Sequence, residues 1–293
     1  MNSIPQIDQW KDAVFDSIAI EADVLRLDLL HPIISGNKWL KLKSYLETAI
    51  DSKKSGILTK GGPWSNHIHA CAYACKEFGL NCHLWIKGNE KQITPTLKDC
   101  IDWGTQIKFI NRTAFYDELS SRKFANENNL LYIPMGGADE IGINSVITYI
   151  SQLSLPSYTH VICAIGTATT FAGFAFTENN FPFIIGIECG TKDKQLNEKI
   201  NDWQQQLPNK KLQLLPQYAF GGLSKYNDDL IAFMNDLYKH RHFSTDFIYT
   251  AKLFYAIKDM AAQLFFPAKS KLLIIHSGGL QGNRSLPAGL LQF

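Results

Sequence analysis

Short apolar runs of strand length alternate with amphipathic stretches along most of the chain. Residues 161–165 and 272–275 are wholly apolar, and small-residue or glycine-rich turns follow them. Residues 228–239 and 252–262 instead carry apolar side chains at steps of three and four, which is the period of a helix. Because buried strands that alternate with helices are joined by crossovers, the pattern predicts an α/β protein with mainly parallel, twisted sheets.

Composition indicates an ordinary globular protein of about two domains. The 293 residues carry 29 Lys and Arg against 27 Asp and Glu, so the net charge is +2. A near-neutral chain lacks the clustered basic face of a nucleic-acid-binding protein. No apolar run reaches the about 18 residues that span a membrane, and residues 1–12 lack the apolar segment of a secretory signal. We therefore expect a cytoplasmic protein without nucleic-acid or membrane partners.

The cysteines are few for a chain of this length, and no two pairs of them have the spacing of a zinc site. We accordingly predict no metal site. Buried, reduced thiols are the simplest interpretation, and they agree with a cytoplasmic location. The six residues are Cys71, Cys75, Cys82, Cys100, Cys163 and Cys189.

Four predicted strand ends carry unusual small or polar residues. They are SGNK at 35–38, GGPWSNH at 61–67, GTATT at 166–170 and HSGG at 276–279. Ligands of open α/β sheets bind beyond the C-terminal ends of the strands. The four segments together are therefore the candidate site.

The segment from Gly166 to Thr170 leads from a strand into a helix and has the composition of a phosphate-binding turn. Small residues let backbone N–H groups approach an anion, and a helix N-terminus adds partial positive charge. The spacing fits neither the Walker loop nor the dinucleotide fingerprint. An ordinary strand-to-helix turn with capping threonines explains the segment equally well.

Lys38 is predicted in the first turn of a helix, for which Asn37 is the expected cap. A lysine near the positive end of a helix is disfavoured as an ammonium, and partial burial lowers its pKa further. Such an amine is nucleophilic enough to form a Schiff base. A solvated surface lysine is the competing interpretation, since Lys41 and Lys43 lie close by in the sequence.

Two more segments offer polar groups at strand ends. A predicted helix opens with Ser65, Asn66 and His67. These residues can offer a hydroxyl, an amide and helix N–H groups to a substrate carboxylate. Capping of the helix by Ser or Asn explains them as well. Ser277 follows a buried strand, where its hydroxyl either meets a ring nitrogen or belongs to a simple turn.

In this order and spacing, SGNKWLKLK, GGPWSNHIH, GTATTFAG, YTAKLFYAI and HSGG resemble the pyridoxal-phosphate enzymes that group 1-aminocyclopropane-1-carboxylate deaminase with D-cysteine desulfhydrase. The resemblance extends from about Leu25 to Gly279. It implies the tryptophan-synthase-β-like fold, type II of these enzymes, with two three-layer α/β/α domains. A large cofactor-binding domain of residues 1–43 and 151–293 and a small domain of residues 44–150 are expected, in a homodimer.

The resemblance also implies catalytic and substrate-binding residues. Lys38 matches the lysine that holds pyridoxal 5′-phosphate covalently and moves the α-proton. Ser65, Asn66 and His67 match the loop that receives the substrate carboxylate. Tyr249 matches an active-site tyrosine, so that Lys38, Ser65 and Tyr249 are the expected catalytic residues.

Further residues match positions that hold the cofactor. Asn66 matches the amide that binds its phenolic oxygen, and Ser277 matches the hydroxyl residue beside its pyridine nitrogen. A neutral partner there favours elimination over transamination. The implied phosphate loop is Gly166, Thr167, Ala168, Thr169 and Thr170.

Four positions depart from the family pattern. Leu223 stands where a second tyrosine is expected, and Thr250 stands where the deaminase has Glu. Ala168 and Ala251 replace usual glycines. Because ring opening of the cyclopropane substrate needs those acidic and phenolic groups, a lyase of the D-cysteine desulfhydrase type is the leading expectation.

The expected reaction is β-elimination from a small amino acid, giving pyruvate and ammonia, and water takes part in the last step. A hydrolase label is therefore expected beside that of a lyase. The deaminase itself is the alternative enzyme. A non-catalytic protein that binds pyridoxal phosphate or another metabolite is the alternative of a different class.

Overall fold

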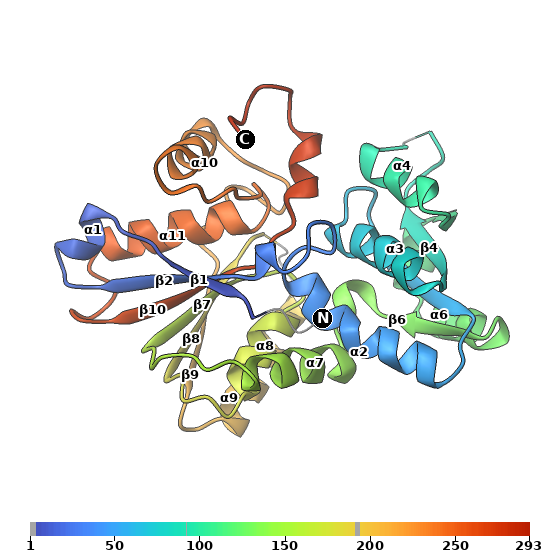
Figure 1. Ribbon diagram of the computed structural model, residues 1–293, viewed down its shortest axis with the longest axis horizontal. Coiled ribbons are helices and arrows are strands. Elements are labelled where there is room, and N and C mark those ends of the chain that lie inside the picture. Colours follow the sequence, from blue (N-terminus) through green and yellow to red (C-terminus); the bar gives the residue numbers. More distant parts are fainter. Residues whose placement is uncertain (1–3, 92, 191–193) are drawn as a thin grey trace.

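Two mainly parallel sheets form the framework of the computed structural model, which describes residues 4–91, 93–190 and 194–293 (Figure 1). The six-stranded sheet has the order β1-β2-β10-β7-β8-β9, and the four-stranded sheet has the order β5-β4-β3-β6. The strands of the larger sheet are β1 Gln6–Gln9, β2 Glu21–Arg26, β7 His160–Ile165, β8 Phe183–Glu188, β9 Lys211–Leu215 and β10 Lys271–His276. Those of the smaller are β3 Gly56–Gly61, β4 Asn81–Lys87, β5 Gln106–Ile110 and β6 Leu130–Ile133.

Strand β10 explains why the apolar runs are continuous instead of alternating. Ile274 pairs with Val24 on one side and Ile162 on the other, both in parallel register. Leu272 and Ile274 belong to the core on one face of the sheet, whereas Leu273 and Ile275 belong to the core on the opposite face. A parallel strand covered on both faces needs apolar residues at every position.

Helices cover both faces of the larger sheet. Side chains of α1 Ala13–Asp16 and α11 Thr250–Ala262 pack into one core, and α7 Glu140–Ser151, α8 Thr169–Phe176 and α9 Lys194–Gln206 pack into the other. Helix α10 Asp228–Arg241 lies against α11 (Figure 1). Short 3₁₀ segments occur at Leu27–Leu29, Met135–Gly137 and Leu280–Ser285. The three-layer α/β/α arrangement that the sequence predicts is confirmed for this sheet.

The smaller sheet is also covered on both faces. Residues of α2 Asn37–Asp51, α3 Asn66–Phe78 and α4 Pro95–Asp102 share one core with its strands. On the other face lie α5 Arg112–Tyr116 and α6 Glu118–Glu127. Helix α6 begins at Glu118 because Asp117 accepts from Ser120 N and caps it.

Helices α2 and α7 lie side by side between the two sheets (Figure 1). Ser44 Oγ donates to Ser145 Oγ at 2.9 Å, and the Tyr45 hydroxyl donates to Asp139. The smaller sheet is made of strands from residues 56–133, and the larger sheet takes strands from both sides of that stretch. The domain limits at residues 43, 44, 150 and 151 stay a prediction.

The other expectations from composition concern cysteines, metals and membranes. All six cysteines are buried and unbridged, as the sequence predicts. Within the described residues, no three His, Cys, Asp or Glu side chains gather as a metal site. The helices of that same part of the chain include none with the length and apolar character needed to cross a membrane.

Candidate active site

The start of α2 is docked onto the backbone of Ser277. Gly36 has a φ of +69°, and a Cβ atom at this position would lie 1.8 Å from the carbonyl oxygen of Ser277. The N–H of Asn37 donates to that same oxygen at 3.2 Å. Only glycine permits this approach. Gly36 is therefore the N-cap, and the expectation that Asn37 caps the helix is wrong.

Asn37 instead connects the predicted lysine to the predicted phosphate loop. Its buried side-chain amide donates to Thr170 Oγ1 at 2.8 Å, while its Oδ1 accepts from Lys38 Nζ at 2.8 Å. Three of the four segments singled out in the sequence therefore meet at Asn37, two through its side chain and the third through its backbone N–H. Sequence reasoning missed this role because Asn at a helix start is most often a cap.

Lys38 is a half-buried amine with a depressed pKa. Burial lowers the pKa of Lys38 to about 8, and the carboxylate of Asp246 only partly opposes this. The side chain lines a cleft of about 540 Å³. A large fraction of this amine is unprotonated near pH 8, which a nucleophile or a base requires.

The turn at residues 166–170 carries unbonded donors. Ala168 adopts a left-handed conformation with φ 58°, and α8 begins at the next residue. No acceptor in the described ranges takes the backbone N–H of Thr167 or Ala168. Thr169 Oγ1 lies 3.0 Å from Thr167 Oγ1. Free amide groups at a helix start favour anion binding over the ordinary turn.

Lys41 is a second buried amine beside that turn. It is 4% exposed, and its Nζ has a single hydrogen-bond partner in the described structure, the carbonyl of Gly136 at 3.4 Å. A Cβ atom on Gly136 would lie 2.8 Å from a side-chain carbon of Thr167. Burial lowers the pKa of Lys41 well below its ordinary value, and Lys38 adds to the effect. In the sequence, the only indication that Lys41 belongs to the site was its position three residues after Lys38.

Asn66 lines the same cleft as Lys38, together with Ser35, Gly279 and Gln281. Gln281 Nε2 donates to Asn66 Oδ1, and a Cβ atom on Gly279 would lie 2.4 Å from Asn66 Nδ2. The amide of Asn66 is thus held against the glycines that follow Ser277. Gln281 is a site residue that sequence reasoning missed.

Ser65 and His67 lie at the start of α3 but differ in direction. Ser65 Oγ caps the helix by accepting from His67 N at 3.2 Å, which is the alternative that the sequence left open. The His67 ring is buried, lies 2.9 Å from Thr59 Oγ1 and does not belong to the cleft lining. Burial lowers the pKa of His67 to about 3. The substrate-binding roles of both residues stay predictions.

Tyr249 is held against the turn by a buried carboxylate. A Cβ atom on Gly166 would lie 3.2 Å from the tyrosine ring. Asp246 accepts from the N–H of Tyr249 at 2.7 Å and from the Thr250 hydroxyl at 2.9 Å. Burial raises the pKa of Tyr249, so its phenol is protonated. The sequence did not single out Asp246.

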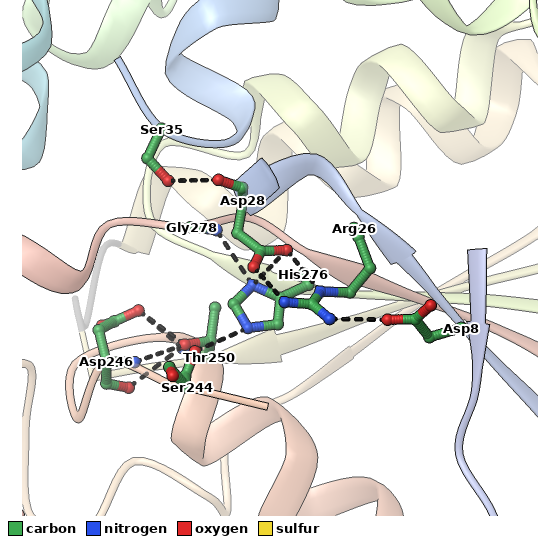
Figure 2. Close-up of polar contacts among 9 residues, drawn as sticks. All are labelled: Asp8, Arg26, Asp28, Ser35, Ser244, Asp246, Thr250, His276 and Gly278. Carbon is green, nitrogen blue, oxygen red and sulfur yellow. Dashed lines mark hydrogen bonds and ion pairs between the residues drawn. The ribbon is translucent and has the colours of Figure 1, made fainter. Parts of the chain in front are cut away.

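A chain of charged groups supports the strand end that presents Ser277 (Figure 2). His276 Nε2 donates to the carbonyl of Ser244 at 2.9 Å, and its Nδ1 lies 3.3 Å from Asp28. Asp28 accepts two hydrogen bonds from Arg26, which also pairs with Asp8 at 2.7 Å. These contacts therefore hold the backbone at His276 in place. The Ser277 hydroxyl itself has no partner in the described part of the chain.

The family model described as "Pyridoxal-phosphate dependent enzyme" matches residues 21–278. The chain belongs to this family of pyridoxal-phosphate-dependent enzymes. Pyridoxal phosphate is its cofactor, and the resemblance stated from the sequence motifs is confirmed.

Relatives of this pyridoxal-phosphate-dependent enzyme include a putative 1-aminocyclopropane-1-carboxylate deaminase of Thermotoga maritima, which is 25% identical over 88% of each chain. A D-cysteine desulfhydrase of Serratia proteamaculans is 23% identical over 90% of this chain and 88% of that protein. A crystal structure of an ACC deaminase homologue covers 95% of this chain and 90% of its own, with a TM-score of 0.79 and 22% identity. The type II fold is thereby confirmed. The relatives' names support a lyase or deaminase, so the expectation of a hydrolase is wrong.

The residues present fit the cofactor. The turn before α8 offers unbonded amide N–H groups, and the buried amine of Lys41, bonded to Gly136 next to that turn, has no carboxylate partner in the described residues. Lys38 supplies an amine of low pKa, and Ser277 supplies an unbonded hydroxyl. Phosphate, aldehyde and pyridine nitrogen thus each meet a group of suitable chemistry.

Proposed function

We propose that the chain is a lyase that eliminates the β-substituent of a small amino acid, with D-cysteine as the leading substrate. D-Cysteine and water are converted to pyruvate, ammonia and hydrogen sulfide. The observation that carries the proposal is the pair of contacts through which Asn37 joins Lys38 to Thr170. That pair of contacts supports a site in which a nucleophilic amine lies beside an anion-binding turn.

Bound pyridoxal phosphate supplies the electron sink that makes the α-proton of an amino acid acidic. In the proposed site the turn at residues 166–170 and Lys41 bind the phosphate. Asn66 and Ser277 orient the ring. Lys38 would hold the cofactor through its amine and would take the α-proton, because about half of that amine is neutral near pH 8.

The substrate carboxylate is proposed to lie at the start of α3, beside Ser65 and Asn66. Backbone N–H groups and the helix dipole favour an anion there. Tyr249, whose ring lies beside Gly166, is proposed to act as a protonated phenol that donates a proton to the leaving group. Holding the substrate between these elements supplies the orientation that the reaction needs.

The choice of D-cysteine over the cyclopropane substrate rests on Thr250 and Leu223. The Thr250 side chain is fully buried and its hydroxyl is bonded to Asp246, so it supplies no acid for ring opening. Leu223 likewise has no phenol. The deaminase reaction is therefore the second candidate and is supported by the names of the relatives.

The test is a panel of amino acids assayed with the purified holoenzyme. D-Cysteine, L-cysteine, D-serine and 1-aminocyclopropane-1-carboxylate are compared by release of α-keto acid, and sulfide is measured for the cysteines. We expect the highest kcat/KM for D-cysteine and none with Lys38→Ala. Faster turnover of the cyclopropane compound would favour the deaminase. Bound cofactor with no turnover of any compound would favour the non-catalytic alternative.

A homodimer in the cytoplasm is part of the proposal, and so is the absence of membrane and nucleic-acid partners. Light scattering of the purified protein tests whether the chain forms a dimer. A mass near 33 kDa would contradict the dimer, because that is the mass of one chain.

A further inference from the structure

Lys252 lies in the interior of the large sheet's helical layer with its charge surrounded by backbone oxygens. The residue is 0% exposed and forms no ion pair with a carboxylate of the described residues. Its Nζ lies 3.1 Å from the carbonyl oxygen of Cys189 and 2.9 Å from that of Ala219. The carbonyl oxygens of Gly222 and Leu223 lie at 2.7 and 3.4 Å.

Four oxygens around one ammonium exceed what ordinary hydrogen bonding uses. A lysine has three N–H donors, so the four contacts cannot all be separate linear hydrogen bonds. Groups of backbone carbonyls that replace a hydration shell are how proteins hold an unhydrated monovalent cation such as K⁺. Burial lowers the pKa of Lys252, and the oxygens are the partners that its charged form needs.

The oxygens come from two loops that are far apart in the sequence. Cys189 directly follows β8, and the other three oxygens belong to residues 219–223, between β9 and α10. Gly190 and Gly222 have φ values of +101° and +147°, and a Cβ atom on Gly190 would lie 2.5 Å from the carbonyl carbon of Gly222. Converging carbonyl dipoles repel one another unless a positive charge lies between them.

The same loops border the proposed active site. Lys252 lies one helical turn after Tyr249, whose carbonyl accepts a weak hydrogen bond from the Cys189 thiol at 3.8 Å. Leu223 and Tyr249 pack against one apolar cluster. A shift of the 219–223 loop therefore changes the surroundings of both side chains.

We propose that Lys252 is a positioning residue whose ammonium acts as a built-in monovalent cation, holding the 219–223 loop so that Leu223 and Tyr249 are placed for the substrate. The part that concerns the substrate rests on the proposed function. The cation-like role of the ammonium rests only on the four oxygens.

Two variants distinguish whether Lys252 acts through its positive charge or only through the bulk of its side chain. Lys252→Ala leaves the space between the four carbonyl oxygens empty, whereas Lys252→Met fills it with an uncharged chain of similar length. Each full-length protein is studied in KCl, NH₄Cl and tetramethylammonium chloride at equal ionic strength. Lys239→Ala, on the exposed end of α10, is the matched control. The measurements are the thermal midpoint of the cofactor-free protein, its refolding yield, and kcat and KM of the holoenzyme.

We expect Lys252→Ala to lose at least tenfold in kcat/KM in tetramethylammonium chloride and to recover at least threefold in KCl or NH₄Cl. Its thermal midpoint and refolding yield should rise in the same two salts. Lys252→Met, Lys239→Ala and the unaltered protein should not respond to the choice of cation. A Lys252→Ala protein that behaves alike in all three salts, or refolds in none, would overturn the proposal.

The thermal and refolding readouts need neither cofactor nor substrate. Cation-specific recovery of the midpoint without turnover of any amino acid would support the cation role while contradicting the proposed activity. If the unaltered protein turns over an amino acid but the Lys252→Ala variant does not respond to the choice of cation, the proposed activity is supported and the cation role is contradicted.

Discussion

The side-chain amide of Asn37 donates a 2.8 Å hydrogen bond to the hydroxyl of Thr170, although the two residues lie far apart in the sequence. The same amide group accepts from Lys38. This contact joins the start of α2 to the start of α8. The site therefore depends on two helix N-termini that approach each other from different parts of the chain.

The depressed pKa of Lys38 predicts how cofactor capture depends on pH. The neutral amine is the reactive form, and its fraction increases as the pH rises through about 8. The rate at which the cofactor-free protein regains visible absorption should rise from pH 6.5 and level off above about pH 8.5. Lys38→Ala is the control and should capture no cofactor. A rate that still climbs at pH 10 would indicate an ordinary exposed lysine.

Replacing Lys41 by Met should weaken phosphate binding while relieving an unfavourable burial. The cofactor-free protein should keep or raise its thermal midpoint, because a buried amine with one carbonyl partner is costly. Affinity for pyridoxal phosphate should fall by about tenfold or more, or roughly 1.4 kcal/mol, while affinity for phosphate-free pyridoxal changes little. Lys43→Met, a partly exposed neighbour, should change neither. Equal losses for both ligands would argue against a phosphate contact.

Ala168→Gly should stabilise the protein. Ala168 has a φ of 58°, and a left-handed conformation costs a non-glycine residue about 1 kcal/mol. The thermal midpoint should rise by roughly 2 °C. Gly79 has a φ of +66° with open space around it, so Gly79→Ala should lower the midpoint by a similar amount. A lower midpoint for Ala168→Gly would show that the methyl group contributes packing that outweighs the strain.

Thr250 should be sensitive to loss of its hydroxyl and tolerant of a smaller residue that keeps it. Thr250→Val removes a hydrogen bond to the buried carboxylate of Asp246 and should cost about 1–3 kcal/mol of unfolding free energy. Thr250→Ser should recover most of this. Thr250→Glu places a second carboxylate beside Asp246 and should be the least stable of the three. Denaturant unfolding provides the comparison, and an unaffected Thr250→Val protein would contradict it.

His67 should contribute to loss of stability in acid. Its pKa is about 3 in the folded protein, below the ordinary value of 6.5. The unfolded chain therefore binds a proton that the folded chain does not, and stability falls as the pH drops from about 6.5 toward 3. His67→Gln should reduce the slope of unfolding free energy against pH by up to about 1.4 kcal/mol per pH unit in this range. A slope identical to that of the unaltered protein would show that His67 titrates normally.

Local patterns were enough to predict most individual elements. The apolar run at 272–275 becomes part of β10, and Ser65 caps α3, which is one of the two caps that the sequence left open. Asp117 likewise caps α6 by accepting from the N–H of Ser120, three residues along the chain. Apolar runs and helix caps involve residues that are close together in the sequence, and sequence patterns can therefore predict them.

The sequence by itself determined the alternation of buried strands and helices, and it placed Lys38, Asn66 and the turn at residue 166 at strand ends. Tertiary structure alone decided which side chains meet there. Asn37 bridges to Thr170, Lys41 contacts Gly136 next to Thr167, and His67 contacts Thr59 outside the cleft lining. Propensity and periodicity describe how a residue interacts with its sequence neighbours, whereas these contacts depend on how distant helices pack and on which amines lose water when they do.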